Sequence, residues 1–304
     1  MTNANIEMNP TTVAILGTGT MGSAMARRLL GAGMVVVAWD RTPARAEQLR
    51  GPGARVQGDV HRASASAQVV LTTLATADAV RQLMVEDHVI DSLATGSIWA
   101  QMGTIGVEET VQLAAEVSSR RPDVLFVDAP VSGSRQPAEA GELLVLASGP
   151  DQARPVLEPI FAAIGKRTLW LGAAGSGTRL KLVLNTWLAF EVEAAAESAA
   201  LADRLGVAPE ALADALNGSP LASPLALAKL SRIQASDYSA DFSLQWALKD
   251  LDLACEAAGP DPVPVARAIA RRWRTLVEAG SGPLDVSAAA LGLGLGGSEE
   301  AVEP

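Results

Sequence analysis

The chain contains very few aromatic, cysteine and histidine residues. Its 304 residues include 11 aromatic side chains, one cysteine and two histidines. The single Cys255 excludes an internal disulfide and fits a reducing compartment, so we expect a cytoplasmic protein. His61, His88 and one cysteine do not have the spacing of a metal site, and no metal is expected.

Long runs of one chemical character are also missing. No run of Lys or Arg exceeds two residues, and 34 acidic against 24 basic residues give a formal charge of -10. This balance argues against nucleic acid and membrane surfaces as partners. A stretch of about 18 apolar residues, which a membrane span requires, does not occur. The polar start MTNANIEMNP also lacks the pattern of a signal peptide.

What the first half does contain is an alternation of short apolar runs and helical patterns. An apolar run at 13–16, a glycine-rich turn at 17–22, a helix at 23–30 and a second apolar run at 34–39 form a βαβ unit. Further strands are expected at 69–74, 97–102, 125–129 and 143–148, and helices at 44–49, 78–84, 107–119 and 152–164. This order predicts an α/β domain with a parallel sheet.

The second half shows no strand pattern. Helices are expected at 178–205, 209–216, 223–233, 244–258, 264–279 and 287–291. We therefore predict an α/β domain over 11–171 and an all-α domain over 172–292, joined by a long interdomain helix. Residues 293–304 have the composition of a disordered tail.

The glycine-rich turn has the pattern Gly-x-Gly-x-x-Gly. Gly17, Gly19 and Gly22 follow a strand and open a helix, which is the context in which this pattern binds a dinucleotide. Gly17 permits the tight turn, Gly19 lets the backbone approach the pyrophosphate, and Gly22 lets helix and strand pack closely. With Thr20 and Met21 between them, these residues predict binding of NAD or NADP.

The residues after the second strand bear on which cofactor binds. Asp40 lies where a carboxylate would bind the ribose 2′-hydroxyl of NAD. Arg41, Thr42 and Arg45 could instead hold the 2′-phosphate of NADP, provided that Asp40 turns away. Solvated loop residues are the alternative for each charge. The cations favour NADP slightly, and NAD stays open.

Two polar residues stand out in the long helix of the second half. Lys181 and Asn185 are four residues apart and share a helix face, while the residues around them are apolar. Burial lowers the pKa of a lysine, which makes it a usable proton donor near neutrality. The alternative is a lysine that snorkels from a buried helix. Trp246, three residues before Lys249, is a candidate for lining the substrate pocket, with core packing as its alternative.

Four motifs in order give a resemblance that covers residues 12 to 290. They are the glycine loop, Ala129-Pro-Val-Ser-Gly133, the run from Gly175 and Gly177 to Lys181 and Asn185, and Lys249-Asp250-Leu251. The chain resembles the β-hydroxyacid dehydrogenases, which include the 3-hydroxyisobutyrate dehydrogenases. The resemblance implies an N-terminal Rossmann domain, a helical C-terminal domain and a homodimer formed through the helical domain.

The resemblance also implies roles for single residues. Lys181 would be the general acid/base and Asn185 a substrate ligand. Substrate would bind at Ser132, Gly133, Ser134 and Lys249. The cofactor would lie beside Leu74 and Ala75, with its nicotinamide end near Thr104 and Lys249. The chain departs from the family pattern at Ser134, at Ala75 and in Gln101-Met-Gly103, which puts the substrate rather than the cofactor in question.

We therefore expect an oxidoreductase that transfers a hydride between nicotinamide and a small β-hydroxyacid, semialdehyde or keto acid. Imine reductases share this architecture, so reduction of a C=N bond is the alternative. They typically carry Asp or Tyr where this chain has Lys181. A non-catalytic dinucleotide-binding module on the same scaffold is the remote third possibility.

Overall fold

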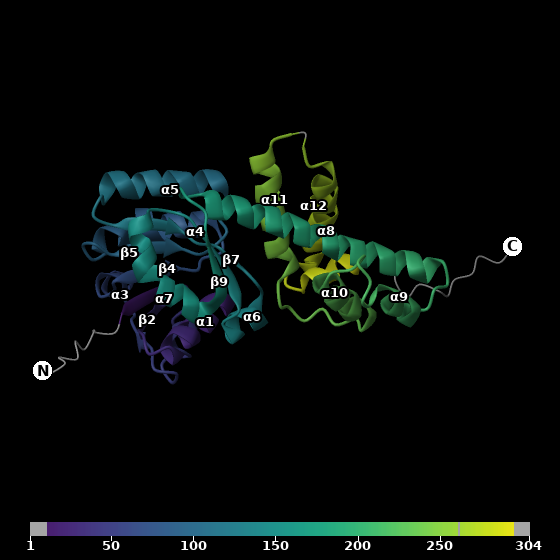
Figure 1. The fold of residues 1–304 in the computed structure, drawn as a ribbon, viewed down its shortest axis with the longest axis horizontal. Coiled ribbons are helices and arrows are strands. Elements are labelled where there is room, and N and C mark those ends of the chain that lie inside the picture. Colours follow the sequence, from purple (N-terminus) through teal and green to yellow (C-terminus); the bar gives the residue numbers. More distant parts are fainter. Residues whose placement is uncertain (1–10, 261, 295–304) are drawn as a thin grey trace, which may run out of the picture. The chain divides into compact units, whose positions relative to one another are not determined.

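The computed structural model describes residues 11–260 and 262–294. Most of the tail predicted at 293–304 lies outside the described residues. The chain forms two compact units, the first ending at Lys181 and the second beginning at Leu182. The division falls inside the long helix α8 (Ser176–Arg204) (Figure 1).

The first unit is built on a six-stranded parallel sheet. Its strands are β1 (Thr12–Leu16), β2 (Val35–Trp39), β3 (Arg55–Val56), β4 (Val69–Thr72), β5 (Ile98–Gln101) and β6 (Leu125–Asp128). The order β3-β2-β1-β4-β5-β6 is that of a Rossmann sheet, which confirms the predicted fold class. The strand order reverses between β1 and β4, so their carboxyl ends border the crevice where such sheets bind ligands.

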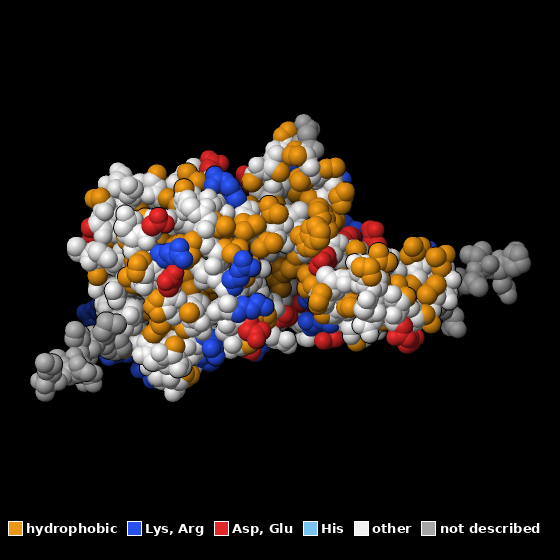
Figure 2. Space-filling view, viewed as in Figure 1, with side chains coloured by type: hydrophobic (Ala, Val, Ile, Leu, Met, Phe, Trp, Pro, Cys, Tyr) orange, Lys and Arg blue, Asp and Glu red, His pale blue; other side chains and the backbone are white. Residues whose placement is uncertain are grey.

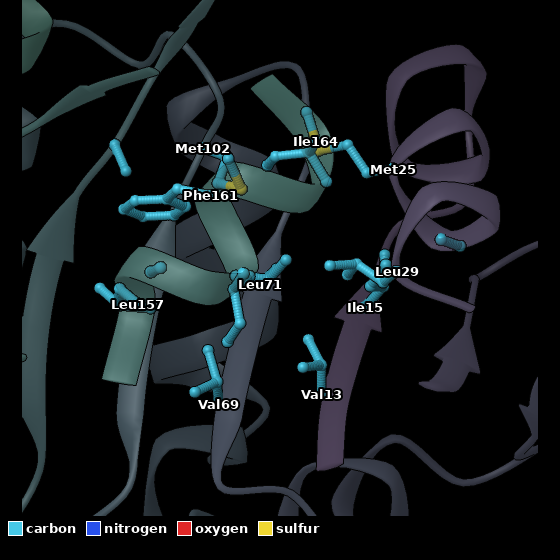
Figure 3. Close-up of a cluster of buried hydrophobic side chains, with 14 of the residues drawn as sticks. Val13, Ile15, Met25, Leu29, Val69, Leu71, Met102, Leu157, Phe161 and Ile164 are labelled. Atoms are coloured by element: carbon cyan, nitrogen blue, oxygen red, sulfur yellow. The ribbon is translucent and has the colours of Figure 1, made fainter. Parts of the chain in front are cut away.

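Helices cover both faces of this sheet because successive strand residues point to opposite sides. Val13 and Ile15 of β1 pack in one core with Phe161 of α7 (Arg154–Ile164), as Figure 3 shows. Ala14 and Leu16 pack in a second core on the other face. The first core takes in α1 (Thr20–Gly31), α2 (Pro43–Glu47) and α6 (Arg135–Ala140); the second takes in α3 (Val60–Ala65), α4 (Ala77–Arg81) and α5 (Val107–Arg120).

A small second sheet completes the first unit. It contains β7 (Val131–Ser132), β8 (Leu143–Ala147) and β9 (Gly165–Trp170), with β7 antiparallel and β9 parallel to β8. The sequence patterns missed β3, β7, β9, α3 and α6, which are short or polar; β9 reads GKRTLW. The helix expected at 78–84 is α4 followed by a π-helical turn, η1 (Gln82–Glu86). Short 3₁₀ turns are η2 (Val89–Ser92) and η3 (Asp151–Ala153).

The second unit is helical, as predicted. After α8 it contains α9 (Pro209–Leu216), α10 (Pro224–Gln234), α11 (Leu244–Ala258), α12 (Pro264–Leu276), a π-helical turn η4 (Val277–Ser281) and a 3₁₀ turn η5 (Val286–Ala290). Its core combines small residues of α8, such as Ala189 and Ala196, with the fully buried Trp273. Small side chains allow the helix backbones to approach closely, which accounts for the alanine-rich composition. Among the described residues, no helix is long and apolar enough to cross a membrane.

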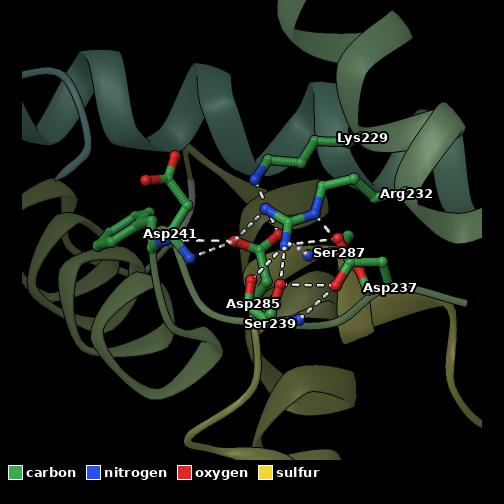
Figure 4. Close-up of polar contacts among 8 residues, drawn as sticks. Lys229, Arg232, Asp237, Ser239, Asp241, Asp285 and Ser287 are labelled. Atoms are coloured by element: carbon green, nitrogen blue, oxygen red, sulfur yellow. Dashed lines mark hydrogen bonds and ion pairs between the residues drawn. The ribbon is translucent and has the colours of Figure 1, made fainter. Parts of the chain in front are cut away.

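A buried ion pair fixes the segment that leads into α11. The fully buried carboxylate of Asp285 accepts a hydrogen bond from Lys229 Nζ at 2.8 Å and from the backbone N–H of Phe242 at 3.2 Å (Figure 4). Burial is the largest single effect and acts to raise the pKa of Asp285, but the hydrogen bonds from Lys229, Ser287 and Phe242 and the charge of Lys229 together outweigh it, so the pKa lies below its usual value. Asp285 therefore ties α10 to the start of α11.

Candidate active site

Two glycines of the loop after β1 are required by the protein's own backbone, and the third is not. Gly17 has a φ of +98°, and a Cβ atom at Gly22 would lie 2.0 Å from the carbonyl oxygen of Gly17. A Cβ atom at Gly19 would meet no atom within 4 Å. Gly19 is also the N-cap residue of α1, whose first turn has no side-chain cap and no acidic residue. The loop thus leaves open space and backbone N–H groups at the start of α1.

The loop after β4 contacts both the glycine loop and the loop after β5. The hydroxyl of Thr73 donates a hydrogen bond to the carbonyl oxygen of Gly17 at 2.5 Å. Gly103 donates its N–H to Gln101 Oε1 at 2.9 Å, and Gln101 Nε2 donates to the carbonyl oxygen of Gly103 at 2.8 Å. A Cβ atom at Gly103 would lie 2.1 Å from the carbonyl oxygen of Leu74. This close approach requires glycine at position 103, and the Gln101 side chain binds both backbone groups of that residue; the two positions depart together from the family pattern.

Asp40 is occupied by partners within the chain. Its Oδ2 accepts hydrogen bonds from the backbone N–H of Thr18 at 2.7 Å and from the Thr18 hydroxyl at 3.2 Å, while Oδ1 accepts from the N–H of Thr42 at 2.8 Å. Asp40 is buried, whereas Arg41, Thr42 and Arg45 are exposed. The carboxylate therefore joins the end of β2 to the glycine loop, and about one of its four acceptor sites, on Oδ1, is left for a further donor.

The family motif at 129–133 is preceded by a buried carboxylate that was not among the predicted site residues. Asp128 at the end of β6 is fully buried and accepts a hydrogen bond from the Thr178 hydroxyl at 2.7 Å and from the Thr178 N–H at 2.9 Å. Burial raises the pKa of Asp128, while these hydrogen bonds act in the opposite direction. Ser132 and Ser134 are half-buried on either side of Gly133, whose φ is +129°.

The two polar residues of the long helix are both buried. Lys181 is 9% exposed and Asn185 is 6% exposed, and they lie one turn apart on α8. The neighbouring Val183, by contrast, is 64% exposed. Lys181 is thus largely removed from bulk water, and its side chain leaves α8 on the same face as Asn185.

Within the second unit Asn185 belongs to a three-residue cluster. Asn185 Nδ2 donates a short hydrogen bond to Asp250 Oδ2, and Lys249 Nζ lies 2.7 Å from Asp250 Oδ1. Asp250 is 4% exposed. Trp246, one turn before Lys249 and Asp250 on α11, is 40% exposed, so core packing does not account for this side chain.

The structure thus groups the predicted residues at two places. The glycine loop, Asp40 and Leu74 come together at the carboxyl edge of the sheet, whereas Asn185 and Lys249 meet through Asp250 in the helical unit. Three residues that hold the loops in place were missed: Thr18, Thr73 and Gln101. Thr18, between Gly17 and Gly19, was an available signal, but Thr18 and Thr73 bind partners 22 and 56 positions away.

The residues present fit a dinucleotide. The switch point between β1 and β4, the open space at Gly19 and the uncapped start of α1 are what a pyrophosphate requires. Thr20 and Met21 begin α1, and Ala75 and Thr104 lie on the loops after β4 and β5. A Rossmann sheet with this loop at its switch point defines a dinucleotide-binding protein.

Comparisons with known proteins give the family. Residues 12–172 match the model for the NAD binding domain of 6-phosphogluconate dehydrogenase, and residues 175–292 match the model for the NAD-binding domain of NADP-dependent 3-hydroxyisobutyrate dehydrogenase. Glyoxylate/succinic semialdehyde reductase 1 of Arabidopsis thaliana is 30% identical over 279 residues, covering 91% of this chain and 96% of the relative.

Solved structures agree with these matches. The 3-hydroxyisobutyrate dehydrogenase of Mycobacterium tuberculosis, solved with L-serine, has a TM-score of 0.82 and 29% identity over 93% of this chain and 98% of that one. An imine reductase from Pseudomonas sp. has a TM-score of 0.58 and 27% identity, covering 92% and 98% of the two chains. The chain belongs to the β-hydroxyacid dehydrogenase family, as predicted, and is an NAD(P)-dependent oxidoreductase.

Proposed function

We propose that the protein reduces the carbonyl group of a small semialdehyde or keto acid to the corresponding hydroxyacid, and that Lys181 is the general acid. The observation that carries this proposal is the buried pair of Lys181 and Asn185 on one face of α8, within a chain that binds NAD(P). The relatives named as glyoxylate/succinic semialdehyde reductase and as 3-hydroxyisobutyrate dehydrogenase support this class of substrate.

The bound cofactor supplies the hydride that reaches the carbonyl carbon. Lys181 donates a proton from its ammonium group to the carbonyl oxygen, and in the reverse direction the neutral amine takes the proton back. Asn185 has one N–H that Asp250 does not use, and this group stabilises the charge that develops on the same oxygen. The carbonyl carbon gains the hydride and the carbonyl oxygen gains the proton, which gives the alcohol.

Recognition of the acid group falls to residues outside α8. The family resemblance assigns recognition of the substrate carboxylate to the hydroxyls of Ser132 and Ser134 in the first unit, with Gly133 between them, and gives the Lys249 ammonium of the second unit as a further substrate-binding group. Trp246 lines the side of the pocket that takes the rest of the substrate, consistent with its 40% exposure.

Reduction of a C=N bond is the alternative reaction. The similarity to an imine reductase structure supports it, whereas the lysine at position 181 favours a carbonyl substrate because an ammonium is suited to protonating an alkoxide. A cyclic imine in the substrate panel decides between them.

We further propose NADP as the preferred cofactor. The Asp40 carboxylate accepts hydrogen bonds from Thr18 and Thr42, and these donors partly offset the charge that would repel a 2′-phosphate. Arg41 and Arg45 are exposed beside it and have the charge that a phosphate requires.

We also propose a homodimer formed through the helical unit, and a cytoplasmic location stays a prediction from composition. Of the nine exposed large hydrophobic side chains among the described residues, eight follow position 181. They are Val183, Trp187, Leu201, Leu205, Val207, Leu221, Trp246 and Val265. Hydrophobic side chains gather over the helical unit in Figure 2, a pattern typical of an association surface.

The test of this function is a substrate panel. Initial rates with glyoxylate, succinic semialdehyde and a cyclic imine are measured with NADH and with NADPH. We expect the highest kcat/KM for a carbonyl acid with NADPH. A cyclic imine turned over with a kcat/KM at least about tenfold above that of every carbonyl acid would overturn the carbonyl proposal.

A further inference from the structure

We propose that Asp128 is a positioning residue for the reaction: its buried carboxylate fixes the first turn of α8 and thereby the place of Lys181. This inference rests on the proposed role of Lys181. Asp128 is fully buried and has no surface to offer a substrate, so its effect on the reaction has to pass through the groups that it holds.

Asp128 caps α8 from a distant strand. Its Oδ2 accepts the N–H of Gly175 at 3.1 Å, the N–H of Thr178 at 2.9 Å and the hydroxyl of Ser148 at 3.0 Å. Its Oδ1 accepts the Thr178 hydroxyl at 2.7 Å. The first N–H groups of a helix have no partner inside the helix, and a side chain just before the helix usually provides one. Here the acceptor comes from the end of β6.

A second contact fixes the same turn against β8. The N–H of Gly177 donates to the Ser148 hydroxyl at 2.9 Å, and Ser148 exchanges two backbone hydrogen bonds with Asp128. A Cβ atom at Gly177 would lie 2.1 Å from the carbonyl oxygen of Leu146. The first turn of α8 therefore lies directly on the sheet backbone and cannot shift along or around its axis without breaking these contacts.

Lys181 follows Thr178 by three residues, on the next turn of the same helix. A helix transmits a displacement of its first turn to the next one almost unchanged. Because a proton donor misplaced by about 1 Å can cost about a hundredfold in rate, loss of the Asp128 cap should lower kcat even though Asp128 touches no reactant.

Two substitutions of Asp128 distinguish the effect of its hydrogen bonds from the effect of its charge. In Asp128→Asn, the amide oxygen can still accept both backbone N–H groups, and the amide nitrogen can donate to the Thr178 hydroxyl. That hydroxyl can then turn its hydrogen toward the Thr110 hydroxyl, 3.4 Å away. Asp128→Ala removes every one of these bonds. Leu157→Ala, at a buried position on α7, serves as a control for general destabilisation.

Steady-state kinetics and cofactor binding are measured well below the melting temperature of the least stable variant. We expect kcat within about threefold of wild type for Asp128→Asn and Leu157→Ala, and a kcat lowered at least about thirtyfold for Asp128→Ala, with the cofactor Kd within about threefold throughout. Asp128→Ala with a kcat within about threefold of wild type would overturn the proposal, as would an equal loss in Leu157→Ala.

The double variant Lys181→Ala/Asp128→Ala shows whether Asp128 acts through Lys181. If it does, adding Asp128→Ala to the Lys181→Ala protein lowers the residual kcat by less than about threefold. If the two substitutions act independently, their losses in kcat multiply, and this result contradicts the proposal. If Lys181→Ala alone retains turnover, the proposed function fails separately from this inference. Should Asp128→Ala not fold, Thr178→Val, which removes only the hydroxyl, takes its place; a kcat lowered at least about fivefold supports the inference and an unchanged kcat overturns it.

Discussion

The side-chain amide of Asn185 donates a hydrogen bond to the carboxylate of Asp250, and the other oxygen of that carboxylate lies 2.7 Å from Lys249 Nζ. An ionised carboxylate can only accept hydrogen bonds, so the nitrogen of the Asn185 amide faces Asp250. The Asp250 carboxylate therefore fixes the orientation of Asn185 and the position of Lys249 at the same time.

Asp250→Asn should lower kcat/KM at least about tenfold, because the ion pair with Lys249 is lost and the Asn185 amide loses a charge-assisted partner. Steady-state kinetics with the best carbonyl substrate measures this. Asp252→Asn is the matched control, since Asp252 is a partly exposed residue of the same helix that pairs with Arg274. If both variants have the same kcat/KM, Asp250 has no role in the reaction.

The glycines of the loop after β1 should separate stability from cofactor binding. Gly22→Ala forces a Cβ atom to within 2.0 Å of backbone and should lower the free energy of unfolding by at least about 2 kcal/mol. Gly19→Ala meets no atom and should leave stability within about 1 kcal/mol while weakening the cofactor Kd at least about tenfold. Urea unfolding and fluorescence titration measure the two quantities. Tight cofactor binding by Gly19→Ala would show that the pyrophosphate does not lie there.

Arg41→Ala should discriminate between the two cofactors. Loss of a charge-assisted contact to the 2′-phosphate should raise the Kd for NADPH about tenfold or more and leave the Kd for NADH within about twofold. Arg50→Ala is the control, because Arg50 is exposed and pairs with Glu47. Equal weakening of NADH and NADPH would contradict the assignment of the 2′-phosphate site.

Asp285 should make stability depend on pH at the acidic end. Its pKa is lowered in the folded protein, so the ionised form stabilises the fold above the unfolded pKa of about 3.9, and this contribution is lost as pH falls through the folded pKa. Asp285→Asn leaves Lys229 buried without its carboxylate and should cost about 3 to 5 kcal/mol at pH 7. Urea unfolding at several pH values should show that this difference shrinks below about pH 4. Asp203→Asn, at an exposed position, should show no such difference.

Sequence patterns were sufficient where local periodicity determines structure. The helices at 209–216 and 244–258 have the predicted bounds, because their apolar spacing and their starting residues are local signals. The strand β9 was missed because a polar strand held by a neighbouring strand carries no periodic apolar signal of its own. The helix α3 was missed because it is short. The glycine loop, in contrast, was predicted because its motif lies within consecutive residues of the sequence.

The missed site residues depend on partners that are distant in the sequence. Asp128 reaches Thr178 across 50 positions and Asn185 reaches Asp250 across 65. No spacing rule connects such pairs, and only the folded chain shows that Asp250 joins Asn185 to Lys249. The engagement of Asp40 by Thr18 is similar, because the sequence left open whether this carboxylate faces the cofactor or the chain.

The role of Lys181 as the proton donor is tested by comparing the turnover of Lys181→Ala with that of Lys166→Ala, at an exposed position of β9. Both variants are first shown to bind NADPH as wild type does, and kcat is then measured with the best carbonyl acid. If Lys181 is the proton donor, Lys166→Ala keeps the wild-type kcat and Lys181→Ala loses at least about a hundredfold in kcat. Turnover by Lys181→Ala within about tenfold of wild type would contradict its role as the proton donor.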